Sequence, residues 1–182
     1  MIRLIDFLAA FLGLLLLWPV LLLVTIIGML DTGSPIFVQT RVGLNKKSFK
    51  LIKFRTMSVE TESVASHLAS NASITKFGNF LRKTKIDELP QLINVVKGEM
   101  SLVGPRPNLF NQEELIRERD AFGVYDVLPG VTGLAQVQNI DMSTPKLLAK
   151  TDKQMIETLN IKNYFKYILM TVTGSGSGDA VK

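Results

Sequence analysis

The longest pattern along the chain is an apolar segment, residues 7–30, that carries no charged side chain. A straight helix of this length would span about 36 Å, enough to cross a hydrocarbon core of ~30 Å. Pro19 follows Trp18 in the middle of the segment, and an internal proline kinks or ends a helix. Each half, roughly 17 Å long, would be too short to cross alone. Two interpretations stay open: one spanning helix, or a helix–break–helix that enters and leaves by the same face.

The charges that flank this segment favour two cytoplasmic ends. Arg3 precedes it, and residues 41–55 carry six basic side chains and no acid. Basic flanks of membrane helices face the cytoplasm, so a spanning helix would leave Arg3 on the wrong side. A secretory signal is not expected, because the apolar run is too long and no small-residue cleavage site follows it.

The remaining pattern predicts alternating short strands and helices. Apolar–polar alternation predicts an antiparallel hairpin from residues 35–40 and 48–55, with Lys53 and Arg55 on one face. That face is either a solvated edge or a phosphate-binding surface. A loop or mobile helix containing His67 is expected over 58–73. Further predictions are a short helix ending at Arg82, a strand at 100–103, a solvent-facing helix at 112–120, a turn then a strand at 128–137, and helices at 143–159 and 163–173.

Composition narrows the chemistry. A length of 182 residues allows one domain with a core. The absence of cysteine excludes disulfides and cysteine-based zinc sites, and a single histidine excludes a histidine-rich metal site. A net charge of +5 favours anionic lipid, nucleic acid or phosphorylated substrates. A hydrophobic content of 47% with a mean hydropathy of +0.25 indicates a membrane segment.

Two adjacent carboxylates, Asp87 and Glu88, lie at what the pattern predicts to be a helix start, where Pro90 fits the first turn. The helix dipole favours a charged carboxylate there by roughly 0.3–1 kcal/mol, and the upstream cations Arg82 and Lys85 act in the same direction. An ionised aspartate among cations can bind a metal or attack phosphorus. Ordinary helix capping is the alternative.

A rigid loop presents one further cation. Arg106 lies between Pro105 and Pro107, and two prolines stiffen the backbone around a guanidinium suited to phosphate. A rigid turn with an incidental surface arginine is the alternative.

Taken in order, these motifs resemble the bacterial sugar transferase family, the monotopic phosphoglycosyl transferases. They extend over nearly all of the chain from residue 1 to about 170, and their order is more specific than any one of them. The matching pieces are Trp18-Pro19, residues 37–43, 53–57, Arg82, 87–92, 98–101, 104–107 and 129–137.

The resemblance implies a reaction and a fold. The family transfers a sugar-1-phosphate from a UDP-sugar to undecaprenyl phosphate and releases UMP. The implied fold is a mostly helical, membrane-associated α/β structure: a re-entrant membrane helix (1–31), a small cytoplasmic catalytic domain with a short β-hairpin and amphipathic interface helices (32–173), and a flexible tail (174–182). The implied location is the cytoplasmic face of a bacterial inner membrane.

The resemblance also implies residue roles. Asp87 resembles the nucleophile, and Glu88 resembles its partner, which supports Mg²⁺ or helps to deprotonate the lipid phosphate. Asp87 and Glu88 are the implied Mg²⁺ ligands, and Trp18 and Pro19 mark the membrane break. The implied partners are a UDP-sugar, undecaprenyl phosphate and a membrane, with a homodimer left open and no nucleic acid. The residues implied to bind phosphate or substrate are Lys53, Arg55, Arg82, Arg106, Pro107 and Gln136.

Some points stay open in the sequence. Leu128 stands where many similar proteins have an arginine before the Pro-Gly pair, so one phosphate-binding cation is missing or comes from elsewhere. The sugar is unspecified, and an N-acetylated amino sugar is the expectation from the resemblance. The competing functions are a membrane-anchored basic binding protein without catalysis, and a transferase that moves only the sugar and releases UDP.

Overall fold

The computed structural model describes residues 1–60, 73–174 and 176. Residues 61–72 of the segment predicted as a loop or mobile helix, which include His67, and most of the predicted tail therefore lie outside the described residues. The elements, in chain order, are α1 (Ile2–Thr32), β1 (Ile36–Val42), η1 (Leu44–Lys46), β2 (Ser48–Phe54), α2 (Lys76–Thr84), η4 (Ile86–Glu88), α3 (Gln91–Lys97), β3 (Ser101–Val103), α4 (Glu113–Ala121), η5 (Val124–Asp126), β4 (Gly130–Thr132), α5 (Leu134–Val137), α6 (Pro145–Thr158) and α7 (Ile161–Val172).

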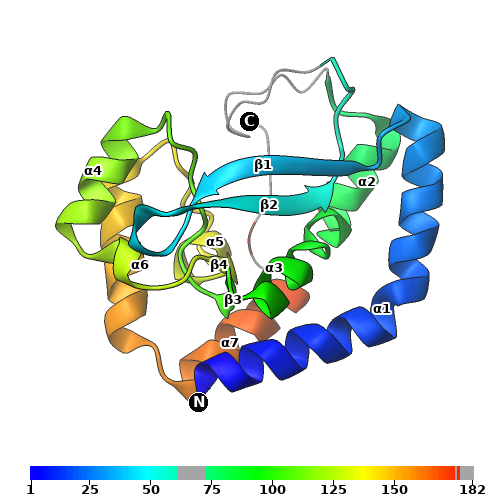
Figure 1. Cartoon of the computed structure of the whole chain (residues 1–182). Helices are drawn as coiled ribbons and strands as arrows, with labels where there is room; N and C mark the ends of the chain where they lie inside the picture. The colour runs from blue at the N-terminus through cyan, green and yellow to red at the C-terminus, as the bar shows by residue number, and fades with distance from the viewer. Residues whose placement is uncertain (61–72, 175, 177–182) are drawn as a thin grey trace.

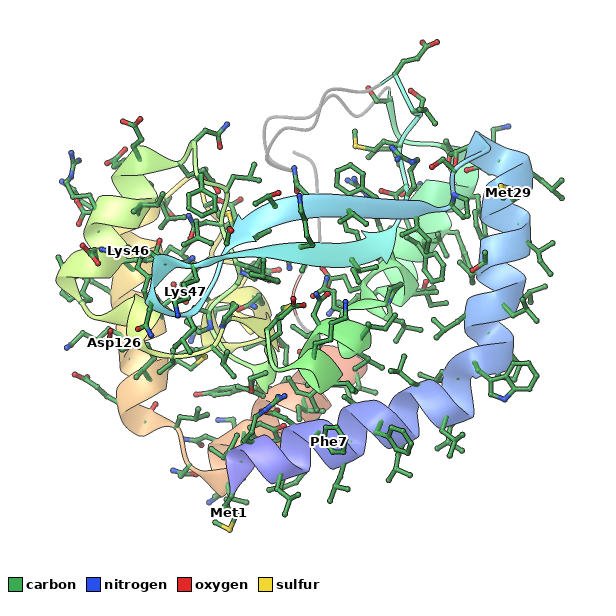
Figure 2. The ribbon with its side chains drawn as sticks, in the orientation of Figure 1. Met1, Phe7, Met29, Lys46, Lys47 and Asp126 are labelled. Carbon is green, nitrogen blue, oxygen red and sulfur yellow. The ribbon has the colours of Figure 1, made fainter. Side chains whose placement is uncertain are left out.

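Helix α1 is the apolar segment, and it runs without interruption through Pro19. Figure 1 shows that it bends about half-way into two arms with different directions. A proline inside a helix removes one backbone hydrogen bond and bends the axis, so the expected break is a bend within a continuous helix. Its large apolar side chains are exposed: Phe7 (labelled in Figure 2) by 41%, Met29 by 56% and Trp18 by 59%. By length and hydropathy α1 is able to cross a membrane, which is consistent with membrane association.

Both arms of α1 are attached to the rest of the molecule through their inner sides. In the first arm the buried Asp6 carboxylate accepts hydrogen bonds from the Ser101 hydroxyl at 3.0 Å and the Tyr164 hydroxyl at 2.6 Å. In the second arm Val24 joins a buried cluster with side chains of β2 and α2. The helix therefore wraps around one side of the globular part, as Figure 1 shows.

The predicted hairpin is confirmed. Strands β1 and β2 pair antiparallel, with Phe37 opposite Lys53 and Arg41 opposite Phe49. Because side chains alternate between faces, Arg41 and Lys53 lie on the same, inner face, and both are buried. Lys50 lies on the opposite face and is exposed, and Figure 2 shows Lys46 and Lys47 at the hairpin tip. Lys53 is therefore not part of a solvated edge.

The second sheet pairs β3 with β4 in parallel. The backbones of Gly104 and Gly130 come so close that a Cβ atom on Gly130 would lie 2.0 Å from the Gly104 nitrogen. The strand predicted within 128–137 is shorter than expected, because residues Leu134–Val137 form the helix α5. Ala135 in α5 packs into a buried cluster with Leu115 and Leu148, and this tertiary packing overrides the strand propensity.

The other helices follow the predicted pattern with two corrections. Helix α4 is not wholly solvent-facing, because it carries the fully buried Arg119 and Leu115. Helix α7 begins at Ile161, earlier than predicted, because the Asn160 side chain accepts a hydrogen bond from the Asn163 backbone at 2.9 Å and caps it. Helix α6 begins at Pro145, as the sequence predicts.

Candidate active site

The carboxylate pair lies in a tight turn between two helices. Helix α2 ends at Thr84, and its C-cap Lys85 has a left-handed backbone (φ 59°, ψ 15°). The 3-10 turn η4 that follows carries Asp87 and Glu88. The pair thus precedes α3 rather than occupying its first turn. Both side chains are buried, and Asp87 is only 2% exposed. A left-handed residue at a helix end reverses the chain sharply, which turns the carboxylates inward.

Glu88 is joined to the proline-flanked loop by an ion pair. Its Oε1 lies 2.8 Å from Nη2 of Arg106. Two other arginines hold the loop through its backbone: Nη1 of Arg119 donates to the Arg106 carbonyl at 2.8 Å, and Nη1 of Arg41 donates to the Pro107 carbonyl at 3.1 Å. The guanidinium of Arg106 therefore projects from a fixed backbone, as the two prolines lead one to expect.

Behind this loop lies a buried ion pair. Nη2 of Arg119 on α4 lies 2.7 Å from Oδ2 of Asp152 on α6, and Nε of Arg119 donates to the same oxygen at 2.9 Å. Nη1 also donates to the Asn108 side chain at 3.0 Å. Burial raises the pKa of Asp152, and the charge of Arg119 opposes this shift. No sequence signal pairs two residues that are 33 positions apart, and this pair was not predicted.

Two adjoining hollows share Arg106 and Val131. The first is also lined by Arg41, Lys53, Gln91 and Pro107, and the second by Lys85, Glu88, Thr132, Gln136 and Thr171, among others. The fold thus brings together five of the predicted site residues from separate segments. They are Lys53, Glu88, Arg106, Pro107 and Gln136. Asp87, next to Glu88, is not among the lining residues.

Two predicted phosphate-binding arginines lie elsewhere. Nε of Arg55 donates to the Ser34 carbonyl at 2.9 Å, and its guanidinium lies 5.3 Å from the centre of the Phe37 ring. Nε of Arg82 donates to the Thr56 hydroxyl at 2.8 Å. Neither arginine lines the two hollows, and their phosphate-binding role stays a prediction.

Two further cations, Arg41 and Lys85, line the hollows, although the sequence does not predict them to bind substrate. The predicted hairpin contains the signal for Arg41, because a register that places Lys53 on the inner face also places Arg41 there. Lys85 stands in the sequence beside the dyad, yet only the left-handed turn shows where it lies. Burial lowers the pKa of Lys85; the Glu88 carboxylate opposes this shift and the Arg106 guanidinium adds to it.

The residues predicted to hold a metal are the two carboxylates Asp87 and Glu88. Within residues 1–60, 73–174 and 176, no group of three or more His, Cys, Asp or Glu side chains could hold a metal ion. Mg²⁺ commonly takes one or two protein carboxylates and completes its shell with water and substrate phosphates. The donor set of Asp87 and Glu88 fits this pattern, whereas it does not fit a metal held entirely by protein.

Comparisons with known proteins identify the family of this chain. The family model described as bacterial sugar transferase matches residues 1–176. The uncharacterized sugar transferase EpsL of Bacillus subtilis is 47% identical over 137 residues, which cover 74% of this chain and 67% of that protein. The UDP-glucose:undecaprenyl-phosphate glucose-1-phosphate transferase of Caulobacter vibrioides is 37% identical over 180 residues, covering 93% of this chain and 67% of that protein.

A third relative carries a different sugar in its name. The UDP-N-acetylgalactosamine-undecaprenyl-phosphate N-acetylgalactosaminephosphotransferase of Aeromonas hydrophila is 33% identical over 184 residues, covering 94% of this chain and 44% of that protein. The chain thus spans about two thirds of the first two relatives and less than half of the third. With a family match over nearly its whole length, the chain belongs to the bacterial sugar transferase family.

Proposed function

We propose that this chain transfers a sugar-1-phosphate from a UDP-sugar to undecaprenyl phosphate and releases UMP. Family membership supports the reaction class, and the names of the Caulobacter and Aeromonas relatives describe this transfer with glucose and with N-acetylgalactosamine. The observation that carries the proposal is the ion pair between Arg106 and Glu88, the neighbour of Asp87 in the sequence. This ion pair lies beside hollows that are also lined by Arg41, Lys53 and Lys85. Such a set suits a substrate with two phosphates.

The proposed chemistry has two steps. A carboxylate oxygen of Asp87 attacks the phosphorus that bears the sugar, the bond from this phosphorus to the UMP oxygen breaks, and UMP leaves. An oxygen of undecaprenyl phosphate then attacks the same phosphorus and frees Asp87, which leaves the sugar on a lipid diphosphate. Splitting the transfer lets one site use a soluble and a lipid substrate in turn. The burial of Asp87 limits contact of the phosphosugar–Asp intermediate with water.

The cations and Glu88 have separate proposed tasks. Arg106 and Lys53 offset phosphate charge, while the Glu88–Arg106 ion pair fixes the guanidinium. Gln136 offers an amide to the substrate. Asp87 and Glu88 would hold Mg²⁺, which supplies a charge that offsets the diphosphate and favours departure of UMP.

We also propose that α1 is re-entrant, with both ends on the cytoplasmic side of a bacterial inner membrane. The contacts of α1 support this: Asp6 near its start and Asp31 near its end both bond to the same globular part, to Ser101 and to Thr75 respectively. A straight helix that crossed the bilayer would separate these two contacts by about 30 Å of hydrocarbon.

The test uses the purified full chain in detergent or lipid discs with Mg²⁺, undecaprenyl phosphate and a panel of UDP-sugars that includes glucose and N-acetylgalactosamine. The readout is the nucleotide released. UMP release with one sugar is expected, and Asp87→Asn should lower the rate at least ~1,000-fold because the nucleophile is lost. Asp126→Asn, an exposed carboxylate on η5, is the matched control and should turn over normally.

Other results would select the competing functions. Release of UDP in place of UMP would identify a transferase that moves only the sugar. Absence of nucleotide release, together with no mass increase on Asp87 after incubation with a crude pool of nucleotide sugars, would favour the non-catalytic binding protein. Turnover that survives Asp87→Asn would overturn the covalent step.

A further inference from the structure

The backbone at Lys85 is unfavourable for the residue that occupies it. Its φ of 59° and ψ of 15° lie in the left-handed region, which is unfavourable for a residue that has a Cβ atom. Glycine, and to a lesser extent asparagine, adopts this conformation more easily. The backbone therefore gives no reason for a lysine at this position, and any reason must lie in the side chain.

The side chain of Lys85 extends into the second hollow. Its Nζ donates to the Thr171 carbonyl on α7 at 3.3 Å, and it lines the hollow with Glu88 and Arg106. Lys85 interacts electrostatically with both of these groups. Among the residues that the structure describes, the charged side chains lining this hollow are Lys85, Arg106 and Glu88, and Glu88 lies 2.8 Å from Arg106. The excess of positive charge favours an anion.

A polar group on the same hollow lacks a protein partner. The amide nitrogen and oxygen of Gln136 are both buried, and neither forms a hydrogen bond with any part of the chain that the structure describes. Burying an amide without hydrogen-bond partners is destabilising, and a ligand with suitable polar atoms would supply those partners. A phosphate oxygen accepts hydrogen bonds from an ammonium and from an amide N–H group alike.

We propose that Lys85 binds a substrate phosphate in the second hollow, as a cation additional to Lys53 and Arg106. This inference rests on the proposed function and extends its phosphate-binding set. The phosphate belongs either to the UDP-sugar or to undecaprenyl phosphate, since both present the same oxygens. A phosphate held by Lys85 would be positioned beside the neighbouring dyad, where the transferring phosphorus reacts.

The test exploits the left-handed backbone. Lys85→Gly removes the ammonium and relieves the backbone, so the thermal midpoint should stay equal or rise. Affinity of the full chain for pyrophosphate or inorganic phosphate, measured by titration calorimetry, should fall at least about 10-fold, the effect of losing one charge-assisted hydrogen bond. Lys85→Arg should keep most of this affinity. Lys83→Ala, an exposed cation on the last turn of α2, is the matched control.

Kinetic arms then identify the phosphate. A slower burst of UMP from the UDP-sugar without lipid would place Lys85 on the nucleotide sugar, and a rise confined to the KM for undecaprenyl phosphate would place it on the lipid. Either result supports the proposal. Lys85→Asn repeats the test with a stiffer left-handed residue in case glycine loosens the turn.

Wild-type affinity for both anions and wild-type KM values in Lys85→Gly and Lys85→Asn would overturn the proposal. If Lys85→Arg also lost the affinity for phosphate and pyrophosphate, the positive charge at this position would not be what binds the anion. This result would also overturn the proposal. If the wild type released no UMP from any sugar, the proposed function would fail, while the calorimetric arms would still decide the role of Lys85.

Discussion

At the scale of single residues, the position of the Arg106 loop depends on buried side chains that do not line the two hollows. Its carbonyl accepts from Arg119, which is itself held by Asp152 and bonded to Asn108. Asn108 in turn accepts from the Tyr125 hydroxyl at 3.0 Å. A buried charge is costly unless it is paired, so the Arg119–Asp152 pair makes the position of the Arg106 loop sensitive to one distant carboxylate on α6.

Removing that carboxylate should destabilise the protein. We expect Asp152→Ala to lower the free energy of unfolding by about 3–5 kcal/mol, because Arg119 keeps a buried charge without its partner. Denaturant unfolding in a fixed detergent measures this. Asp120→Ala breaks the half-exposed pair with Lys46 and should cost less than about 1 kcal/mol.

The double variant Arg119→Met/Asp152→Leu separates stability from function. It removes both charges, so stability should recover most of the loss. It also removes the hydrogen bond to the Arg106 carbonyl, so the KM for the UDP-sugar should be higher than in the wild type. A double variant with wild-type KM would show that the pair does not position Arg106.

At the scale of elements, α1 combines two kinds of surface. Its outer side exposes large apolar residues along both arms, and its inner side carries the buried Asp6, Ala10, Val24 and Gly28. After the second arm the chain turns back sharply into β1, so that Pro35 packs closely against Gly28. A Cβ atom on Gly28 would lie only 2.9 Å from the Pro35 Cβ. The bend at the middle of the helix and this return together let both arms contact one body (Figure 1).

Replacing the proline should change the topology of α1. Pro19→Ala restores a backbone donor and favours a straight helix long enough to span. The chain has no cysteine, so Ile2→Cys provides a single label. We expect the label to react from the cytoplasmic side in the parent and to become protected there, and accessible from the opposite side, in Pro19→Ala.

Pro145→Ala is the control, because Pro145 opens α6 at a helix N-terminus, where proline needs no hydrogen bond. It should leave the labelling unchanged. Cytoplasmic labelling in both the parent and Pro19→Ala would defeat the proposed role of the bend.

At the scale of the whole molecule, Asp6 joins the membrane helix to the catalytic part. Its Oδ1 accepts from the Ser101 hydroxyl, the Leu102 backbone and the Tyr164 hydroxyl, so one carboxylate links α1, β3 and α7. Burial, and then Asp6 itself, raise the pKa of Tyr164, which keeps its hydroxyl as a donor. Strand β3 leads directly into the Arg106 loop, and α7 carries Thr171 at the second hollow.

Loss of this junction should therefore affect both stability and catalysis. We expect Asp6→Ala to lower the free energy of unfolding by at least about 3 kcal/mol, because three buried or half-buried donors lose a charged acceptor. Turnover should also fall, since β3 and α7 both border the site. Asp31 lies at the exposed end of the same helix and accepts a hydrogen bond from the Thr75 hydroxyl. Asp31→Ala should lower the free energy of unfolding by about 1 kcal/mol or less. Equal effects of the two variants would contradict the junction.

The sequence by itself determined the local and the chemical features. Helical spacing, proline and glycine positions fixed α1, the hairpin and most helix limits, because these depend on neighbours within a few residues. The ordered motifs identified the family, and they predict that Asp87 and Glu88 form the catalytic dyad. The sequence predicts a strand at Leu134–Val137, where the structure has helix α5. Ala135 in this helix packs against side chains of α4 and α6, which the local sequence does not reveal.

Only the tertiary structure decided which distant groups meet. The pairing of Arg119 with Asp152, the attachment of Asp6 to β3 and α7, and the separation of Arg55 and Arg82 from the hollows all depend on how elements far apart in the sequence pack. Lys85 shows the difference most clearly. Its neighbours in the sequence are known without a fold. The direction of its side chain follows from one left-handed backbone conformation and from the hydrogen bond that its Nζ donates to the Thr171 carbonyl on α7.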